Sequence, residues 1–157
     1  MPIYLEQEQL GKKILRHFHL ESRQEPDWKP WQKLVDTIKN PPTKVNVAIV
    51  GKYLDIGDFS LTDSYVSIYQ ALVHAGAQQD VGISIQWINS QTFEAHPERL
   101  QELSRFDGVI IPGGFGNAGV EGKIAAIGYV RDHHIPYLGL CYGMQLAAVE
   151  FARNKCA

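Results

Sequence analysis

The sequence predicts an α/β protein with a doubly wound, mostly parallel sheet, and two observations carry this prediction. From residue 45 onward, short apolar segments alternate with amphipathic segments of helical length. The apolar segments are hydrophobic almost throughout, which is typical of parallel strands covered by helices on both faces. We expect these strands at residues 45–50, 83–88, 108–111 and 135–140. Their order in the sheet does not follow from the pattern.

Helices are expected between and after the strands, at residues 62–75, 97–106, 120–131 and 142–153. Gly76 should end the first of them, because glycine readily adopts the left-handed conformation that closes many helices. In the second helix, Leu100 and Leu103 should face inward. The last helix offers for packing Met144, Leu146, Ala147 and Phe151.

Residues 1–43 differ in composition from the rest of the chain. They are polar and contain several prolines, and the run Asn40-Pro41-Pro42 would break any helix. Apolar residues at helical spacing predict one short amphipathic helix at residues 31–38. We interpret residues 1–43 as a linker that carries two short helices, and residues 44–157 as one α/β domain.

Composition and charge exclude several classes of protein. The chain has 157 residues and a formal net charge of −2, which gives no electrostatic reason to expect nucleic acid or an anionic membrane as a partner. No apolar stretch approaches the roughly 20 residues that span a bilayer, and the N-terminus lacks the features of a signal peptide. Two cysteines, Cys141 and Cys156, make no disulfide framework, and no flanking ligands suggest a metal site. We therefore expect a cytoplasmic protein without a metal.

The most informative segment is Gly139-Leu140-Cys141-Tyr142-Gly143, a G-x-C-x-G pattern at a strand-to-helix junction. It is the thiol counterpart of the G-x-S-x-G nucleophile elbow, in which small residues let strand and helix approach around a sharp turn. The positive end of the helix dipole and unpaired N–H groups at this position favour a thiolate. The alternative is a small buried cysteine, which is the commoner role of a lone one. The flanking glycines favour the nucleophile.

Acyl transfer at such a thiol also needs hydrogen-bond donors for the oxyanion. The backbone N–H of Tyr142 is one, because it follows the nucleophile directly. A second is expected from the glycine-rich loop at residues 112–116, although glycines alone are equally consistent with a tight turn. The same loop contains a G-x-G-x-x-G pattern at residues 114–119. A dinucleotide site is disfavoured, because this loop follows the third strand and the candidate acid, Asp132, ends a helix rather than a strand.

With these residues together, the sequence resembles class I (triad-type) glutamine amidotransferases. The resemblance is carried by the loop at residues 112–116 and by the segment at residues 136–145. It implies a flavodoxin-like fold and hydrolysis of L-glutamine to glutamate and ammonia, with Cys141 forming a glutamyl thioester. It also implies that oxyanion donors and glutamine-pocket residues are Gly113, Gly114, Tyr142, Gly143, Met144 and Gln145.

Residues 50–53 leading into 63–68, together with residues 119–123, narrow the resemblance to one branch of that family. In this branch the ammonia passes to a synthetase domain that aminates UTP with ATP and Mg²⁺, within a homotetramer of pyrimidine biosynthesis. Residues 3–20 resemble the tail of that synthetase domain. Tyr142 replaces the usual aliphatic residue, which preserves its backbone donor. Ala118 stands where an arginine linked to GTP activation is common, so a response to GTP is in question.

The triad of the family is completed by a His-x-Glu pair far downstream of the cysteine, and this chain contains no such pair there. His96-Pro97-Glu98 has the same spelling but precedes the cysteine, and Pro97 fits the first position of an exposed helix. His133 and His134 lie before the last strand. At about 3.3 Å per residue, that strand places them roughly 15–20 Å from Cys141, which is too far for either to act as its general base. We therefore expect the chain alone to be inactive and to self-associate. A non-catalytic α/β module, or another thiol hydrolase with this elbow, is the alternative.

Overall fold

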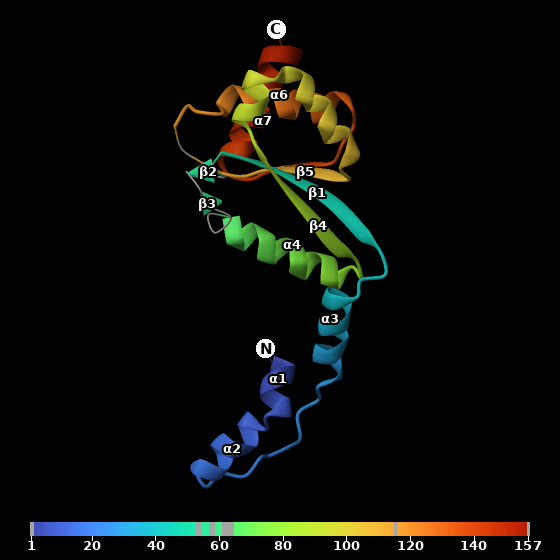
Figure 1. The fold of residues 1–157 in the computed structure, drawn as a ribbon, viewed down its shortest axis with the longest axis vertical. Coiled ribbons are helices and arrows are strands. Elements are labelled where there is room, and N and C mark those ends of the chain that lie inside the picture. The colour runs from blue at the N-terminus through green and yellow to red at the C-terminus, as the bar shows by residue number, and fades with distance from the viewer. Residues whose placement is uncertain (1, 53–54, 57–58, 61–64, 115, 157) are drawn as a thin grey trace.

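The computed structural model describes residues 2–52, 55–56, 59–60, 65–114 and 116–156. Three helices come first, followed by strands and helices in alternation (Figure 1). In chain order the elements are α1 (Pro2–Gln7), α2 (Leu10–His17), α3 (Lys29–Lys39), β1 (Lys44–Gly51), β2 (Asp55–Ile56), β3 (Phe59–Ser60), α4 (Val66–Gln78), β4 (Gly82–Asn89), α5 (Gln91–Ala95), the 3₁₀ helix η2 (Pro97–Arg105), β5 (Gly108–Ile111), α6 (Val120–Asp132), β6 (Tyr137–Gly139) and α7 (Tyr142–Lys155).

The main sheet has the strand order β4-β1-β5-β6, and all of its described pairings are parallel. The doubly wound α/β prediction is therefore confirmed, and the structure adds the strand order that the pattern left open. In the register of β5 and β6, Ile111 lies opposite Gly139. The carboxyl ends of these two strands therefore lie level at one edge of the sheet.

Helices cover both faces of this sheet, with α4 on one side and α6 and α7 on the other (Figure 1). Alternating residues of β1 point to the two sides, as the pleat requires. Val47 and Ile49 join the core beneath α4, whereas Ala48 and Val50 join the larger core beneath α6 and α7. The near-continuous apolar strands thus reflect burial on both faces.

Several predicted elements have different limits in the structure. Residues 1–43 carry three described helices rather than two, of which α3 contains the predicted helix at 31–38. The helix predicted at 97–106 is the 3₁₀ helix η2, with Leu103 fully buried and Leu100 packed on the core as expected. The helix predicted from residue 62 is α4, which begins at Val66; residues 62–64 lie outside the described residues. The short helix α5 and the β2–β3 hairpin were not predicted.

Gly76 does not end α4, contrary to the prediction. It lies inside the helix, where an added Cβ would come within 2.7 Å of the Val81 carbonyl oxygen and 2.8 Å of Ile83. Close approach to β4 therefore explains this glycine. The left-handed residue that closes the helix is Asp80, at φ 55°. The N–H of Val81 donates to the Gly76 carbonyl at 2.9 Å, a Schellman-type closure.

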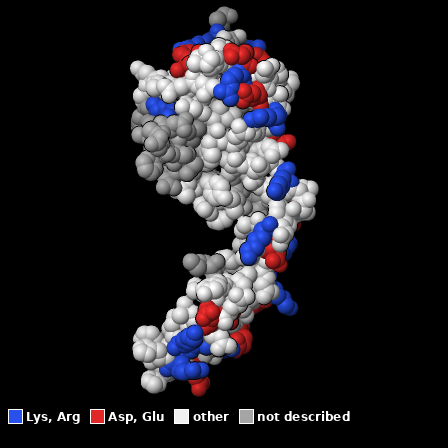
Figure 2. Space-filling view, viewed as in Figure 1, with Lys and Arg blue, Asp and Glu red and all other residues white. Residues whose placement is uncertain are grey.

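The N-terminal helices extend away from the sheet, joined to it through α3 (Figure 1). Figure 2 shows basic and acidic side chains interspersed on the visible face of both parts, so no field of a single sign forms there. Among the described residues no helix is long and apolar enough to cross a membrane.

Candidate active site

Cys141 occupies the strained turn between β6 and α7. Its φ of 52° and ψ of −106° are rare for a residue with a side chain, and its thiol is exposed. Backbone strain of this kind costs of order 1–3 kcal/mol and is concentrated at functional sites. Cys141 is also the N-cap residue of α7, so its side chain lies at the positive end of a 14-residue helix. The elbow predicted from G-x-C-x-G is present.

Two glycines make this turn possible because any side chain would collide with backbone. A Cβ on Gly143 would overlap the carbonyl oxygen of Ile111, and one on Gly139 would come within 2.7 Å of the Met144 nitrogen. The Ile111 carbonyl also accepts the N–H of Leu140 at 3.0 Å. From the other side, the Tyr137 hydroxyl donates to the Gly143 carbonyl at 2.7 Å. Burial raises the pKa of Tyr137 to about 12, so the phenol stays a neutral donor.

The predicted oxyanion loop lies beside the thiol. A Cβ built on Gly113 would lie 3.5 Å from the Cys141 Cβ and 3.8 Å from its Sγ. Adjacent parallel strands bring the two together, since the loop follows β5 and the cysteine follows β6. Within the described residues the N–H groups of Tyr142, Gly113 and Gly114 have no acceptor. Free donors of this kind can serve a developing oxyanion.

The remaining predicted pocket residues lie on the first turn of α7. Met144 is 61% exposed and Gln145 is exposed, whereas Gly143 is buried against β5. The first two therefore face open space on the helix that carries the thiol.

Two lysines that the sequence analysis did not single out lie against the loop. Lys123, on the first turn of α6, is 1% exposed and donates from Nζ to the Pro112 carbonyl at 3.3 Å. Lys52, at the end of β1, donates to the Gly116 carbonyl at 3.3 Å. Burial, and then the charge of Lys52, lowers the pKa of Lys123 to about 8. Both lysines lie in segments that carry the resemblance, at residues 50–53 and 119–123, but only the three-dimensional fold brings them to one loop.

A buried ion pair holds α7 against α6. Glu150 is 1% exposed and accepts from Arg131 at 2.6 and 2.9 Å, and from Asn154 at 2.9 Å. These hydrogen bonds, first of all those from Arg131, lower the pKa of Glu150. The pair fixes the orientation of the helix whose N-terminus carries the thiol.

The histidines judged unsuitable as bases lie away from the thiol. His133 and His134 follow α6 at the amino end of β6, whereas Cys141 follows its carboxyl end. His134 has φ 55°, the left-handed position of a helix closure in which Ile135 donates to the Val130 carbonyl at 2.9 Å. His96 is exposed beside Glu98 at 3.3 Å, and Pro97 begins η2 as predicted.

The loop with the dinucleotide pattern leads from β5 into α6, and Asp132 ends that helix, as the sequence analysis expected. Asp132 pairs with Arg131 at 2.6 Å and lies 3.8 Å from the Lys155 ammonium. It therefore takes part in surface ion pairs at the far end of α6. Among the described residues no group of three or more His, Cys, Asp or Glu side chains could hold a metal ion.

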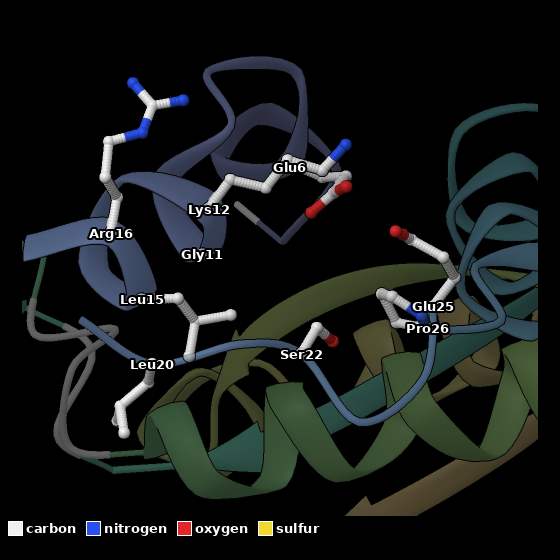
Figure 3. A pocket seen from close by; sticks show the side chains of 9 residues that line it. All are labelled: Glu6, Gly11, Lys12, Leu15, Arg16, Leu20, Ser22, Glu25 and Pro26. Atoms are coloured by element: carbon white, nitrogen blue, oxygen red, sulfur yellow. The ribbon is translucent and has the colours of Figure 1, made fainter. Parts of the chain in front are cut away.

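A hollow of about 460 Å³ lies between α2 and the segment that follows it (Figure 3). Leu15 and Leu20 form its apolar part, and Lys12 and Glu25 lie at its margins. It contains none of the predicted site residues.

The geometry of an elbow thiol beside a glycine loop agrees with the comparisons with known proteins. A sequence model described as glutamine amidotransferase class-I matches residues 60–156, a span that contains Cys141 and every other predicted site residue. The chain belongs to the class I glutamine amidotransferases. This membership excludes an unrelated thiol hydrolase with the same elbow.

Within that class, the chain is similar to CTP synthases. It is 47% identical over 161 residues to CTP synthase of Methanocaldococcus jannaschii, covering 99% of this chain and 29% of the relative. It is 49% identical over 154 residues to CTP synthase of Pyrococcus furiosus, covering 98% and 27%. A solved structure, the glutaminase domain of Trypanosoma brucei CTPS with bound acivicin, has a TM-score of 0.63 and 40% identity, covering 71% of this chain and 41% of that one. The chain thus spans less than a third of the length of these curated relatives.

Proposed function

We propose that residues 44–157 are part of the glutaminase domain of a CTP synthase, with Cys141 as its nucleophile. The strained, exposed Cys141 facing Gly113 carries this proposal. The similarity to CTP synthases and to a glutaminase domain with bound acivicin, a glutamine analogue, supports it.

The reaction begins when the Cys141 sulfur attacks the side-chain amide carbon of L-glutamine. The carbonyl oxygen becomes an oxyanion, which accepts from the N–H of Tyr142 and from the loop at Gly113 and Gly114. The C–N bond then breaks, the thiol proton leaves with the nitrogen as ammonia, and a glutamyl thioester remains. Water cleaves the thioester to glutamate and restores the thiol.

A general base must take the thiol proton, and its conjugate acid must give that proton to the leaving nitrogen. His133 and His134 lie at the other end of β6 from the thiol, and the His-x-Glu pair of the family, which is not found among the described residues, fits the role of the base. Met144 and Gln145, on the exposed first turn of α7, would line the glutamine pocket.

The activity of the whole enzyme is proposed from the same similarity to CTP synthases. Ammonia would pass to a synthetase domain that aminates UTP with ATP and Mg²⁺ in a cytoplasmic homotetramer. Ala118 stands where an arginine linked to GTP activation is common, so the response to GTP should be reduced.

Labelling of the purified chain with a glutamine chloroketone, followed by peptide mapping, tests the nucleophile. Cys141 should be labelled first, and free L-glutamine should protect it. The exposed Cys156 is the internal control, because it lies at the opposite end of α7. Equal labelling of both thiols, or no protection, would refute the assignment.

In the full-length enzyme, Cys141→Ala should abolish glutamine-dependent amination and leave ammonia-dependent amination intact.

A further inference from the structure

We propose that Lys123 is a positioning residue that sets the direction of the Gly113 N–H through the peptide bond between Pro112 and Gly113. The inference rests on the proposed function, since it assigns a role in the same oxyanion site. It begins from the burial of the Lys123 side chain, which is 1% exposed.

Buried ammonium groups are rare and are normally paired with a carboxylate, because removing the charge from water is costly. Within the described residues Lys123 has no such partner, and its hydrogen bond goes to the Pro112 carbonyl at 3.3 Å. Burial lowers the pKa of Lys123, and the positive charge of Lys52 lowers it further. Core stability therefore does not explain a lysine at this position.

The hydrogen bond to Pro112 has a consequence for the next residue. The Pro112 carbonyl and the Gly113 N–H belong to one planar peptide group, and in a trans peptide they point in opposite directions. The described chain contains no cis peptide bond. An ammonium group that holds the carbonyl on one side therefore fixes the direction of the N–H on the other.

That N–H belongs to a residue beside the thiol, since a Cβ on Gly113 would lie 3.8 Å from the Cys141 Sγ. Glycine is otherwise free to rotate its peptide group. A cation on the carbonyl also polarises the peptide and strengthens its N–H as a donor. Lys52 holds the far end of the same loop through the Gly116 carbonyl at 3.3 Å.

The test compares two reagents on the purified chain. A glutamine chloroketone is bound by the site, which places its carbonyl oxygen against the oxyanion donors while the thiol attacks, whereas iodoacetamide alkylates the thiol without this recognition. Loss of one oxyanion donor costs about 10²–10³-fold in rate in enzymes. Lys123→Met, which keeps the length and removes the charge, should slow chloroketone labelling of Cys141 at least about 10-fold, with the iodoacetamide rate unchanged.

Lys155→Met makes the same substitution at the exposed end of α7 and should change neither rate. Lys123→Arg keeps a donor and should recover most of the chloroketone rate, and it carries the comparison if Lys123→Met does not fold. An unchanged chloroketone rate in Lys123→Met, or a parallel fall in both rates, would overturn the inference. Failure of the full-length enzyme to label at Cys141 would instead refute the proposed function.

Discussion

Substitution of Gly143 by alanine tests whether the elbow depends on close backbone contact. The added Cβ would overlap the Ile111 carbonyl oxygen, which already accepts the Leu140 N–H at 3.0 Å. Alanine in a helix is favoured over glycine by about 1 kcal/mol, so helix propensity alone predicts a gain in stability. Overpacking against a well-packed core costs about 1–3 kcal/mol, and here the obstacle is strand backbone rather than a flexible side chain.

We therefore expect Gly143→Ala to lower the free energy of unfolding by up to about 2 kcal/mol, as the difference between these two effects. Separating α7 from β5 also displaces Cys141 relative to Gly113, so chloroketone labelling of the thiol should slow. Urea unfolding and the labelling rate measure the two effects. The matched control is Gly108→Ala at the start of β5, where the nearest atom to an added Cβ is 3.6 Å away. A Gly143→Ala variant as stable and as reactive as the wild type would refute the reasoning.

Three further predictions concern charge and exposed surface. Because the pKa of Glu150 is lowered in the folded state, its contribution to stability is present above pH 4.5 and lost as the pH falls. Glu150→Gln should therefore lower the urea midpoint at pH 7. On acidification this variant should lose less stability than the wild type. The pKa of Lys123 falls from 10.5 to about 8 on folding, so the unfolded chain binds more protons between these two pH values. Stability should therefore rise with pH across that window, by at most about 3 kcal/mol. The urea midpoints at pH 7 and pH 10 should differ less in Lys123→Met than in the wild type. Leu138 is 51% exposed on β6, the last strand of the described sheet, so size-exclusion chromatography should show self-association of the purified chain that Leu138→Lys reduces; a monodisperse wild-type monomer would contradict this expectation.

The elbow turn and the place of the loop beside it could be predicted from the sequence because their signals are local. Gly139, Cys141 and Gly143 specify a turn within five residues, and that turn has the expected strain. The apolar strands could be predicted in the same way, because a strand that is buried on both faces contains few polar residues. Residues 108–111 form β5 with the predicted limits.

Features that depend on distant residues could not be predicted in this way. The role of Lys123 requires α6 to pack behind the loop after β5, and a lysine in an amphipathic segment ordinarily indicates a solvent-exposed face. Gly76 was misinterpreted for the same reason. A glycine is needed at position 76 because β4 packs closely against the helix there. The residue that closes the helix in the left-handed conformation is Asp80.

The elbow depends on the lack of a side chain at two positions, and this should limit how the segment varies among related proteins. Gly139 and Gly143 contribute only the lack of a Cβ, and the turn contacts backbone groups such as the Ile111 carbonyl. The residue after the nucleophile must instead keep its main-chain N–H and an apolar side chain, because Tyr142 packs against the core. Tyr142, an aromatic where the family usually has an aliphatic residue, is a substitution of this permitted kind. Gly139 and Gly143 should accordingly be the least variable positions of this segment.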